Sequence, residues 1–202
     1  MTPAIKLLER GKHAHQVLRY EHDKQAESFG LEAVEKLSLE APTVFKTLVA
    51  ELDTGKLVVA IVPVTHQLNL KQLAKAAGAK KAQMAPPAKV ESTTGYVLGG
   101  VSPLGQKKAL PTFIDESAAQ LELIYCSAGK RGLEIELAPQ LLASLTRATF
   151  APPSELAYLQ RLQNEQQRSL VHGSGLGPYL KTFVKEIVIS DEAEKRLASW
   201  SL

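Results

Sequence analysis

The sequence has little cysteine, few aromatic residues and no long apolar run. Cys126 is the single cysteine among 202 residues, so no disulfide can form within the chain. The longest apolar run, at 57–64, is far too short to span a bilayer. The first residues lack a basic region followed by an apolar stretch and a cleavage site, so we expect no signal peptide. These absences favour a cytoplasmic protein with no membrane partner.

Several common catalytic and ligand-binding motifs are missing as well. The five histidines have no zincin-type spacing with acidic or cysteine clusters, and no Gly-x-Ser-x-Gly elbow occurs. The glycine-rich stretch 94–105 is neither a dinucleotide fingerprint nor a Walker loop. Cys126 lies in an apolar segment and is interpreted as a small core residue rather than a nucleophile. We expect no metal and no cofactor, so any hydrolysis must borrow its reactive group.

What the sequence does contain is typical of a folded protein with a basic middle. The hydrophobic fraction of 45% and the charged fraction of 22% suit one globular core. Residues 55–115 carry eight lysines against two acidic residues, whereas the net charge of the whole chain is +3. Such a block favours a polyanionic partner, because lysines displace the counterions of phosphates. A solvated lysine-rich face is the alternative, and charge alone does not separate the two.

Periodicity and turn residues predict a mixed α/β fold. Strands alternate with helices up to about residue 150, which indicates one domain over 1–150. A C-terminal extension over 151–202 is predicted to contain a helix at 154–170, a strand at 181–189 and a short helix at 191–200. The predicted helices of the domain are 3–10, 31–37, 70–77, 87–92 and 139–145. Its predicted strands are 15–20, 43–52, 57–64, 112–114, 121–126 and 133–137, with a turn at 127–132.

Lys46 is unusual because it lies inside the apolar segment Val44–Leu48. A lysine that points into a core or cleft loses hydration and needs a partner. On the pattern alone, a lysine that extends past the sheet edge into water is the favoured interpretation. A lysine in a functional cleft is the alternative.

Two other segments offer candidate binding groups. Backbone N–H groups of the stretch 95–105 could cradle an oxyanion or a phosphate, and a pair of tight turns is the equal alternative. Glu134 and Glu136 share one face of a predicted strand, where a carboxylate could orient an amino group. On pattern alone, a solvent-facing strand edge is the favoured interpretation for these two acids.

Taken together, these segments resemble the YbaK/EbsC family. The resemblance rests on Tyr20-Glu21-His22-Asp23, on Val44 to Leu48, on Gly78 to Lys81, on Ser92 to Tyr96, on Gly99 to Lys108 and on Gly129 to Leu137, in that order. It covers residues 1 to about 150. It implies a partly barrel-like mixed sheet with flanking helices, the editing-domain fold also found in bacterial prolyl-tRNA synthetases.

The resemblance also implies a function and a site. The YbaK branch is associated with trans-acting removal of cysteine from Cys-tRNA(Pro), in which the substrate thiol attacks its own ester and expels the tRNA. By this resemblance Lys46, Gly99 and Gly100 are the catalytic positions. Tyr20, Ser102, Ser127 and Glu134 are the substrate-binding positions. Glu134 stands where relatives often have Asp, and residues after 150 have no recognised counterpart in short members of the family.

Partners and rival functions complete the expectations. The acceptor end of proline tRNA is the expected partner, with prolyl-tRNA synthetase as a further one, and the oligomeric state is left open. The lysines expected to contact tRNA flank the glycine-rich stretch: Lys71, Lys75, Lys80, Lys81, Lys107 and Lys108. The rival functions are editing of another misacylated tRNA such as Ala-tRNA(Pro), and a non-catalytic module that binds tRNA or a synthetase. The product chemistry, hydrolase or lyase, is open.

Overall fold

The computed structural model describes residues 1–26 and 28–152. The α-helices in this part are α1 (Pro3–Arg10), α2 (Phe29–Lys36), α3 (Leu70–Ala76), α4 (Pro87–Thr94) and α5 (Pro139–Thr146). The strands are β1 (Gln16–Arg19), β2 (Phe45–Leu52), β3 (Leu57–Pro63), β4 (Ala82–Met84), β5 (Thr112–Asp115), β6 (Ile124–Lys130), β7 (Leu133–Leu137) and β8 (Thr149–Ala151). The elements predicted at 154–170, 181–189 and 191–200 lie outside the described residues.

Side-chain caps start α1 and α3 where the sequence predicted, whereas α2 begins at Phe29, two residues before the predicted start. The Thr2 hydroxyl accepts a hydrogen bond from the Ile5 N–H at 3.3 Å, and proline follows at the first helical position of α1. The Asn69 side-chain oxygen Oδ1 accepts a hydrogen bond from the Gln72 N–H at 3.0 Å at the start of α3. Each cap satisfies a backbone donor that has no partner within its helix. None of the helices in the described part of the chain has both the length and the apolar character needed to cross a bilayer.

The strands form two sheets that meet at one point. The first sheet is antiparallel with the order β1-β7-β6, and the second has the order β4-β2-β3-β5-β8. In the second sheet β2 is antiparallel to β3 and β4, whereas β3–β5 and β5–β8 are parallel pairs. A single bridge between Val44 and Tyr125 links the sheets. The mixed α/β class is confirmed, but the described strands do not close into a barrel.

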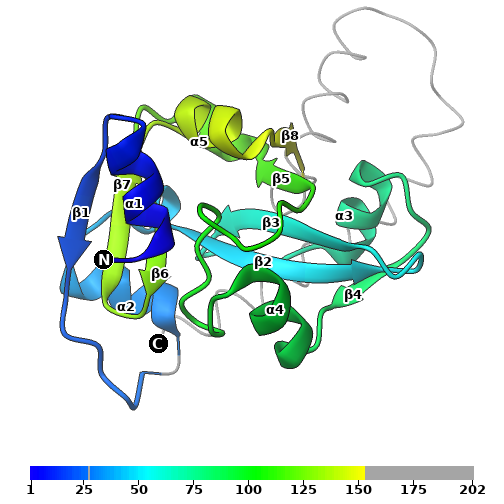
Figure 1. Ribbon diagram of the computed structural model, residues 1–202, viewed down its shortest axis with the longest axis horizontal. Coiled ribbons are helices and arrows are strands. Elements are labelled where there is room, and N and C mark those ends of the chain that lie inside the picture. Colours follow the sequence, from blue (N-terminus) through cyan, green and yellow to red (C-terminus); the bar gives the residue numbers. More distant parts are fainter. Residues whose placement is uncertain (27, 153–202) are drawn as a thin grey trace, which may run out of the picture. The chain divides into compact units, whose positions relative to one another are not determined.

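Helices cover both faces of the five-stranded sheet (Figure 1). On one face Leu73 of α3 packs with Ala50 and neighbouring residues of β2 and β3. On the other face Val90 of α4 packs with Phe45 and Val49, within the larger core shared with α1, α5 and the three-stranded sheet. Successive side chains of a strand point to opposite faces, so β2 contributes to both cores. The two faces therefore separate α3 from α4.

The strand β6 differs from the prediction. It runs to Lys130, and the expected turn over 127–132 is largely strand with a bulge between Ser127 and Lys130. Gly129, at φ 99°, supplies the backbone conformation that the bulge needs. Glycine and small polar residues signal bulges as well as turns, which explains the difference. The three-residue strands β4 and β8 were not predicted, because three residues carry no readable alternation.

Candidate active site

A cavity of about 310 Å³ opens beside β2, where the two sheets diverge. Its wall draws on the start of α2, most of β2, the β4–α4 connection, the glycine-rich stretch and the pair β6–β7. The residues lining it are Ser28, Phe29, Gly30, Val44, Phe45, Lys46, Thr47, Leu48, Val49, Met84, Ala85, Val90, Leu98, Gly99, Val101, Ser127 and Glu134. Most are apolar, so the few polar groups among them fix how a ligand can bind.

The cavity exists because β2 has neighbours only at its two ends on this side. The short strand β4 pairs with Ala50–Leu52, and β6 meets the chain at Val44. Between these points, within the described residues, no strand pairs with positions 45–48 on the edge opposite β3. A strand edge without a neighbour leaves room and unpaired backbone groups at the floor of the cavity.

Lys46 lies in the cavity wall and is half-buried. Burial lowers the pKa of its ammonium group, because the charged form loses hydration. The Lys46 side chain makes no hydrogen bond or ion pair with the described residues. On the pattern alone we favoured a lysine that extends past the sheet edge into water. The structure instead places Lys46 in the wall of a cavity. Its charge is available to a ligand.

Glu134 is the second ionisable group of the cavity. It lies on β7, the central strand of its sheet, opposite Leu18 on one side and Ser127 on the other. Its side chain is buried, with a relative exposure of 8%, and this burial raises the pKa of the carboxyl group from 4.5 to about 8. The favoured interpretation of a solvent-facing edge is therefore wrong for this residue. Glu136 instead accepts a hydrogen bond from the Tyr125 hydroxyl at 2.6 Å.

The other predicted substrate positions divide into two groups. Ser127 lines the cavity beside Glu134, and its hydroxyl accepts from the Gly129 N–H at 3.2 Å. Tyr20 is half-buried outside the lining. Burial, and then the nearby charges of Glu134 and Glu32, raise its pKa to about 12. Ser102 is fully buried and also outside the lining; its hydroxyl accepts from the backbone of its own loop.

Gly99 and Gly100 form a tight turn at the mouth of the cavity. Gly99 has a φ of 82°, and the Gly100 N–H donates to the Val97 carbonyl at 3.0 Å. That N–H is therefore committed to the turn. A Cβ on Gly99 would lie 2.5 Å from the Phe29 ring, and one on Gly100 would lie 3.2 Å from the backbone of Arg131. The tight packing, together with the positive φ at Gly99, requires glycine.

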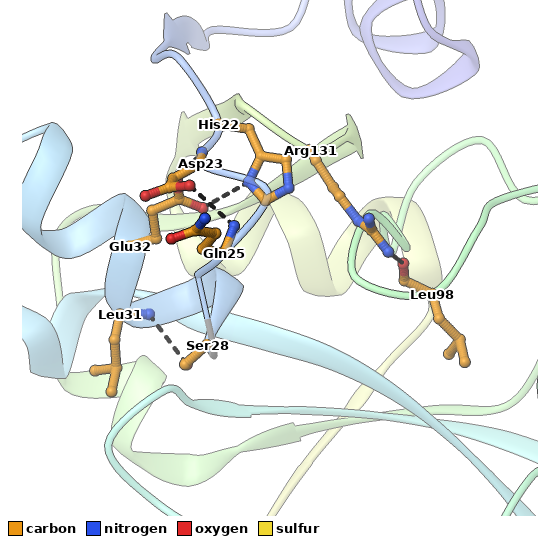
Figure 2. A network of polar contacts seen from close by, with 8 residues as sticks. All are labelled: His22, Asp23, Gln25, Ser28, Leu31, Glu32, Leu98 and Arg131. Atoms are coloured by element: carbon orange, nitrogen blue, oxygen red, sulfur yellow. Dashed lines mark hydrogen bonds and ion pairs between the residues drawn. The ribbon is translucent and has the colours of Figure 1, made fainter.

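Phe29 and Arg131 are two site residues that the sequence did not reveal. The Arg131 guanidinium lies over the Phe29 ring, 4.4 Å from its centroid, and its Nη2 donates to the Leu98 carbonyl at 2.8 Å. Figure 2 shows this side chain reaching from β6–β7 to the residue before Gly99. The Gly-Lys-Arg-Gly segment was a signal for Arg131, but nothing in the sequence paired it with a phenylalanine about 100 positions away.

A hydrogen-bonded contact between His22 and the buried Glu32 fixes the segment before α2. His22 Nδ1 lies 2.7 Å from a carboxylate oxygen of Glu32, and the Asp23 N–H donates to the other oxygen at 2.6 Å (Figure 2). Burial acts to raise the pKa of Glu32, but the hydrogen bonds from Asp23 and His22 and the nearby charges outweigh it and lower the pKa. The His22 ring also contacts the Phe29 ring, with 5.4 Å between centroids.

The six lysines predicted to contact tRNA are all exposed but do not form one surface. Lys71 and Lys75 lie on α3, and Lys80 and Lys81 follow it before β4. Lys107 and Lys108 lie elsewhere, because their N–H groups donate to Thr94 and Thr93 carbonyls at the end of α4. Helices α3 and α4 cover opposite faces of the sheet, so the two sets of lysines are separated.

Two further features of the described residues concern metal-ligand clusters and the single cysteine. Residues 1–26 and 28–152 contain no group of three or more His, Cys, Asp or Glu side chains arranged to hold a metal. Cys126 is fully buried, and burial together with the charge of Glu134 raises its pKa well above the usual range. A thiol in that state is a poor nucleophile. The cavity therefore offers one poorly hydrated cation, Lys46, and one poorly hydrated carboxyl group, Glu134.

Comparison with known proteins places this site in a family. Residues 24–145 match the aminoacyl-tRNA editing domain family. The chain is 43% identical over 151 residues to a protein of Enterococcus faecalis named "Putative Cys-tRNA(Pro)/Cys-tRNA(Cys) deacylase EbsC". The match covers 74% of this chain and 91% of that protein.

Two solved structures share the fold. One, described as a putative trans-editing enzyme for prolyl tRNA synthetase, has a TM-score of 0.67 at 23% identity and covers 77% of this chain and 98% of its own. The other, a hypothetical protein, has a TM-score of 0.69 at 22% identity, and the match covers 76% of this chain and 100% of that one. These identities bear on the fold alone, whereas the domain match and the Enterococcus relative identify the family. The chain belongs to the YbaK/EbsC family of aminoacyl-tRNA editing domains.

Proposed function

We propose that this protein removes cysteine from Cys-tRNA(Pro), using the thiol of the substrate as the nucleophile. The observation that carries the proposal is the cavity itself: Lys46 and Glu134 face it together, and its lining contains no cysteine and no histidine. A hydroxyl nucleophile needs an adjacent base such as histidine. The lack of the two commonest side chains for activating or supplying a nucleophile among these lining residues supports a reaction in which the substrate brings its own.

The proposed reaction breaks the ester between cysteine and the 3′ adenosine of the tRNA. The substrate thiol loses its proton to water, and its sulfur attacks the ester carbonyl carbon to form a carbon–sulfur bond. The tetrahedral intermediate then collapses, the carbon–oxygen bond breaks, and the ribose oxygen takes up a proton. The products are free tRNA and a four-membered cysteine thiolactone, which water opens to cysteine. The enzyme acts as a lyase in the first step, and the net reaction is a hydrolysis.

Lys46, Glu134 and the Gly99 turn each have a role in this reaction. The Lys46 ammonium hydrogen-bonds to the ester region, where it stabilises the charge that develops on oxygen. Glu134, on ionisation, holds the α-amino group of the cysteine, and Ser127 lies beside it. The Gly99 turn lies against the carbonyl. Because the Gly100 N–H already bonds to Val97, Gly100 contributes through the shape of the turn.

Cysteine attached to tRNA(Pro) by mistake has to be removed at a separate editing site, because cysteine is close to proline in size. A synthetase pocket rejects such an analogue only by the modest factor that a small apolar difference allows. The printed name of the Enterococcus relative includes both Cys-tRNA(Pro) and Cys-tRNA(Cys), which share the cysteinyl ester. We therefore propose that the cavity selects the amino acid, and that contacts outside it, including prolyl-tRNA synthetase, select the tRNA.

A deacylation assay across tRNA(Pro) charged with cysteine, serine, alanine or proline tests the proposal. We expect rapid loss of cysteine, slow loss of serine, and trapping of the thiolactone by an added amine. Rapid release of alanine instead would favour the rival editing activity, and equal rates for cysteine and serine would contradict thiol assistance. Binding without release of any amino acid would favour a non-catalytic module.

The variant Lys46→Ala tests the site itself. We expect it to lose most activity, by roughly two orders of magnitude, as for loss of one donor to a developing oxyanion. The control is Lys56→Ala, which removes an exposed lysine from the β2–β3 turn. Wild-type turnover by a folded Lys46→Ala protein would refute the assignment.

A further inference from the structure

We propose that Arg131 is a positioning residue, which holds the Gly99–Gly100 turn in its active geometry through Phe29 and Leu98. The proposal rests on the proposed function, since it names what sets the turn against the ester carbonyl. Arg131 does not line the cavity and has no place among the groups that touch the substrate. Its contacts all lead to residues that do line it.

The first contact is with the backbone of the turn. Nη2 of Arg131 donates to the Leu98 carbonyl at 2.8 Å, one residue before Gly99. That peptide group joins Leu98 to Gly99, so the hydrogen bond fixes the orientation of the peptide that enters the turn. A planar guanidinium holds such an acceptor in a defined direction, whereas a lysine ammonium does not.

The second contact fills the space beside the turn. A Cβ on Gly99 would meet the Phe29 ring at 2.5 Å and Nε of Arg131 at 3.0 Å. Phe29 and Arg131 therefore press on the same side of Gly99, with the guanidinium 4.4 Å from the ring centroid. A residue with a φ of 82° and no side chain has broad conformational freedom, and this packing removes that freedom.

The third contact fixes the ring from behind. The His22 ring contacts Phe29 with 5.4 Å between centroids, and His22 is itself held by Glu32 at 2.7 Å. Figure 2 shows His22, its partner Glu32, and Arg131 with its hydrogen bond to Leu98. The buried Glu32 thus holds His22, His22 packs on Phe29, and Phe29 packs on Gly99. Each of these contacts restricts the movement of the next side chain or turn.

The experiment compares Arg131→Lys and Arg131→Met with Lys130→Met in the full-length protein. Lys130→Met removes one positive charge from the neighbouring exposed position. Steady-state kinetics on Cys-tRNA(Pro) give kcat and KM, and ¹⁵N-labelled free protein gives the amide resonances of Gly99 and Gly100. The resonances report the turn even if the protein lacks deacylase activity, so failure of the proposed function and failure of this inference are distinguishable.

We expect both Arg131 variants to lower kcat by about tenfold or more, since a small misplacement of a catalytic group has such effects. Both should shift or broaden the Gly99 and Gly100 resonances. Arg131→Lys should do so although it keeps the charge, and Lys130→Met should leave kcat and both resonances unchanged.

Two results would overturn the inference. Unchanged glycine resonances in Arg131→Met would show that the turn does not depend on the guanidinium. A rise in KM alone, equal in Arg131→Met and Lys130→Met and absent in Arg131→Lys, would make Arg131 a contact for tRNA phosphates. If Arg131→Met does not fold, Arg131→Lys and Phe29→Leu carry the test, with the same expected loss of kcat and the same glycine readout.

Discussion

The unusual titration of Glu134 leads to a measurable dependence of stability on pH. Its carboxyl group has a pKa of about 8 in the folded protein, against an ordinary value of 4.5, because it is buried in the cavity wall. Between these two pH values the unfolded chain releases the proton and the folded chain retains it. The folded state therefore loses stability as pH rises from about 4.5, and the loss is complete above about 8.

The size of the effect follows from the same two values. Each pKa unit corresponds to about 1.36 kcal/mol, so the full change approaches about 5 kcal/mol. The substitution Glu134→Gln keeps the shape and removes the titration. We expect the free energy of unfolding of wild type, relative to Glu134→Gln, to fall by several kcal/mol between pH 4.5 and pH 8.5.

Urea unfolding of both proteins across this pH range measures the difference directly. Other buried groups, such as Lys46 and His66, titrate in both proteins and cancel in the comparison. Glu9→Gln, on the exposed face of α1, is the matched control and should remain parallel to wild type. Parallel curves for Glu134→Gln and wild type would refute the reasoning, because they would mean that Glu134 has the same pKa in the folded and the unfolded protein.

Three further predictions follow from described residues. Cys126→Ala should leave deacylation unchanged and cost roughly 1 kcal/mol of stability, measured by urea unfolding, because the thiol packs in the core; lost activity in a folded variant would implicate the thiol. Gly105→Ala should cost at least ~2 kcal/mol, since φ is +67° and the new Cβ would lie 2.6 Å from the Pro3 carbonyl carbon; an unchanged unfolding midpoint would contradict this packing. Replacing Lys107 and Lys108 by alanine should weaken tRNA binding and reduce the slope of log affinity against log salt by about 1.5, with kcat unchanged; an unchanged slope would place the phosphate contacts elsewhere.

The sequence predicted the elements well where local chemistry determines them. Caps such as Thr2 and Asn69, and the turn between β2 and β3, are properties of a few adjacent residues. The pairing of β5 between β3 and β8 could not be predicted, because parallel neighbours are joined by long connections that leave no local signal. The same limit applied to the bulge in β6, where the glycine signal fits a turn equally well.

The site was predictable only in part for the same reason. Lys46 and Glu134 were named from local oddities and from resemblance, and the structure brings both to one cavity. The contact between Phe29 and Arg131 became visible only once α2 and the β6–β7 connection were placed near each other. The burial of Glu134 also could not be predicted from the alternation of polar and apolar residues, which assigns this position to solvent. In the structure Glu134 lies on the central strand of its sheet and is buried.

The interrupted pairing along β2 has a consequence for edge-to-edge pairing between strands of different molecules. An exposed strand edge invites pairing with a strand of another molecule, which is the first step of β-sheet aggregation. Here the open stretch at 45–48 lies at the floor of a cavity whose wall includes Phe29 and Leu98. A second polypeptide strand needs a long open edge, whereas a single aminoacyl group needs only a short one. The same short gap in strand pairing that leaves room for a ligand is thus too short to act as an edge for a second strand.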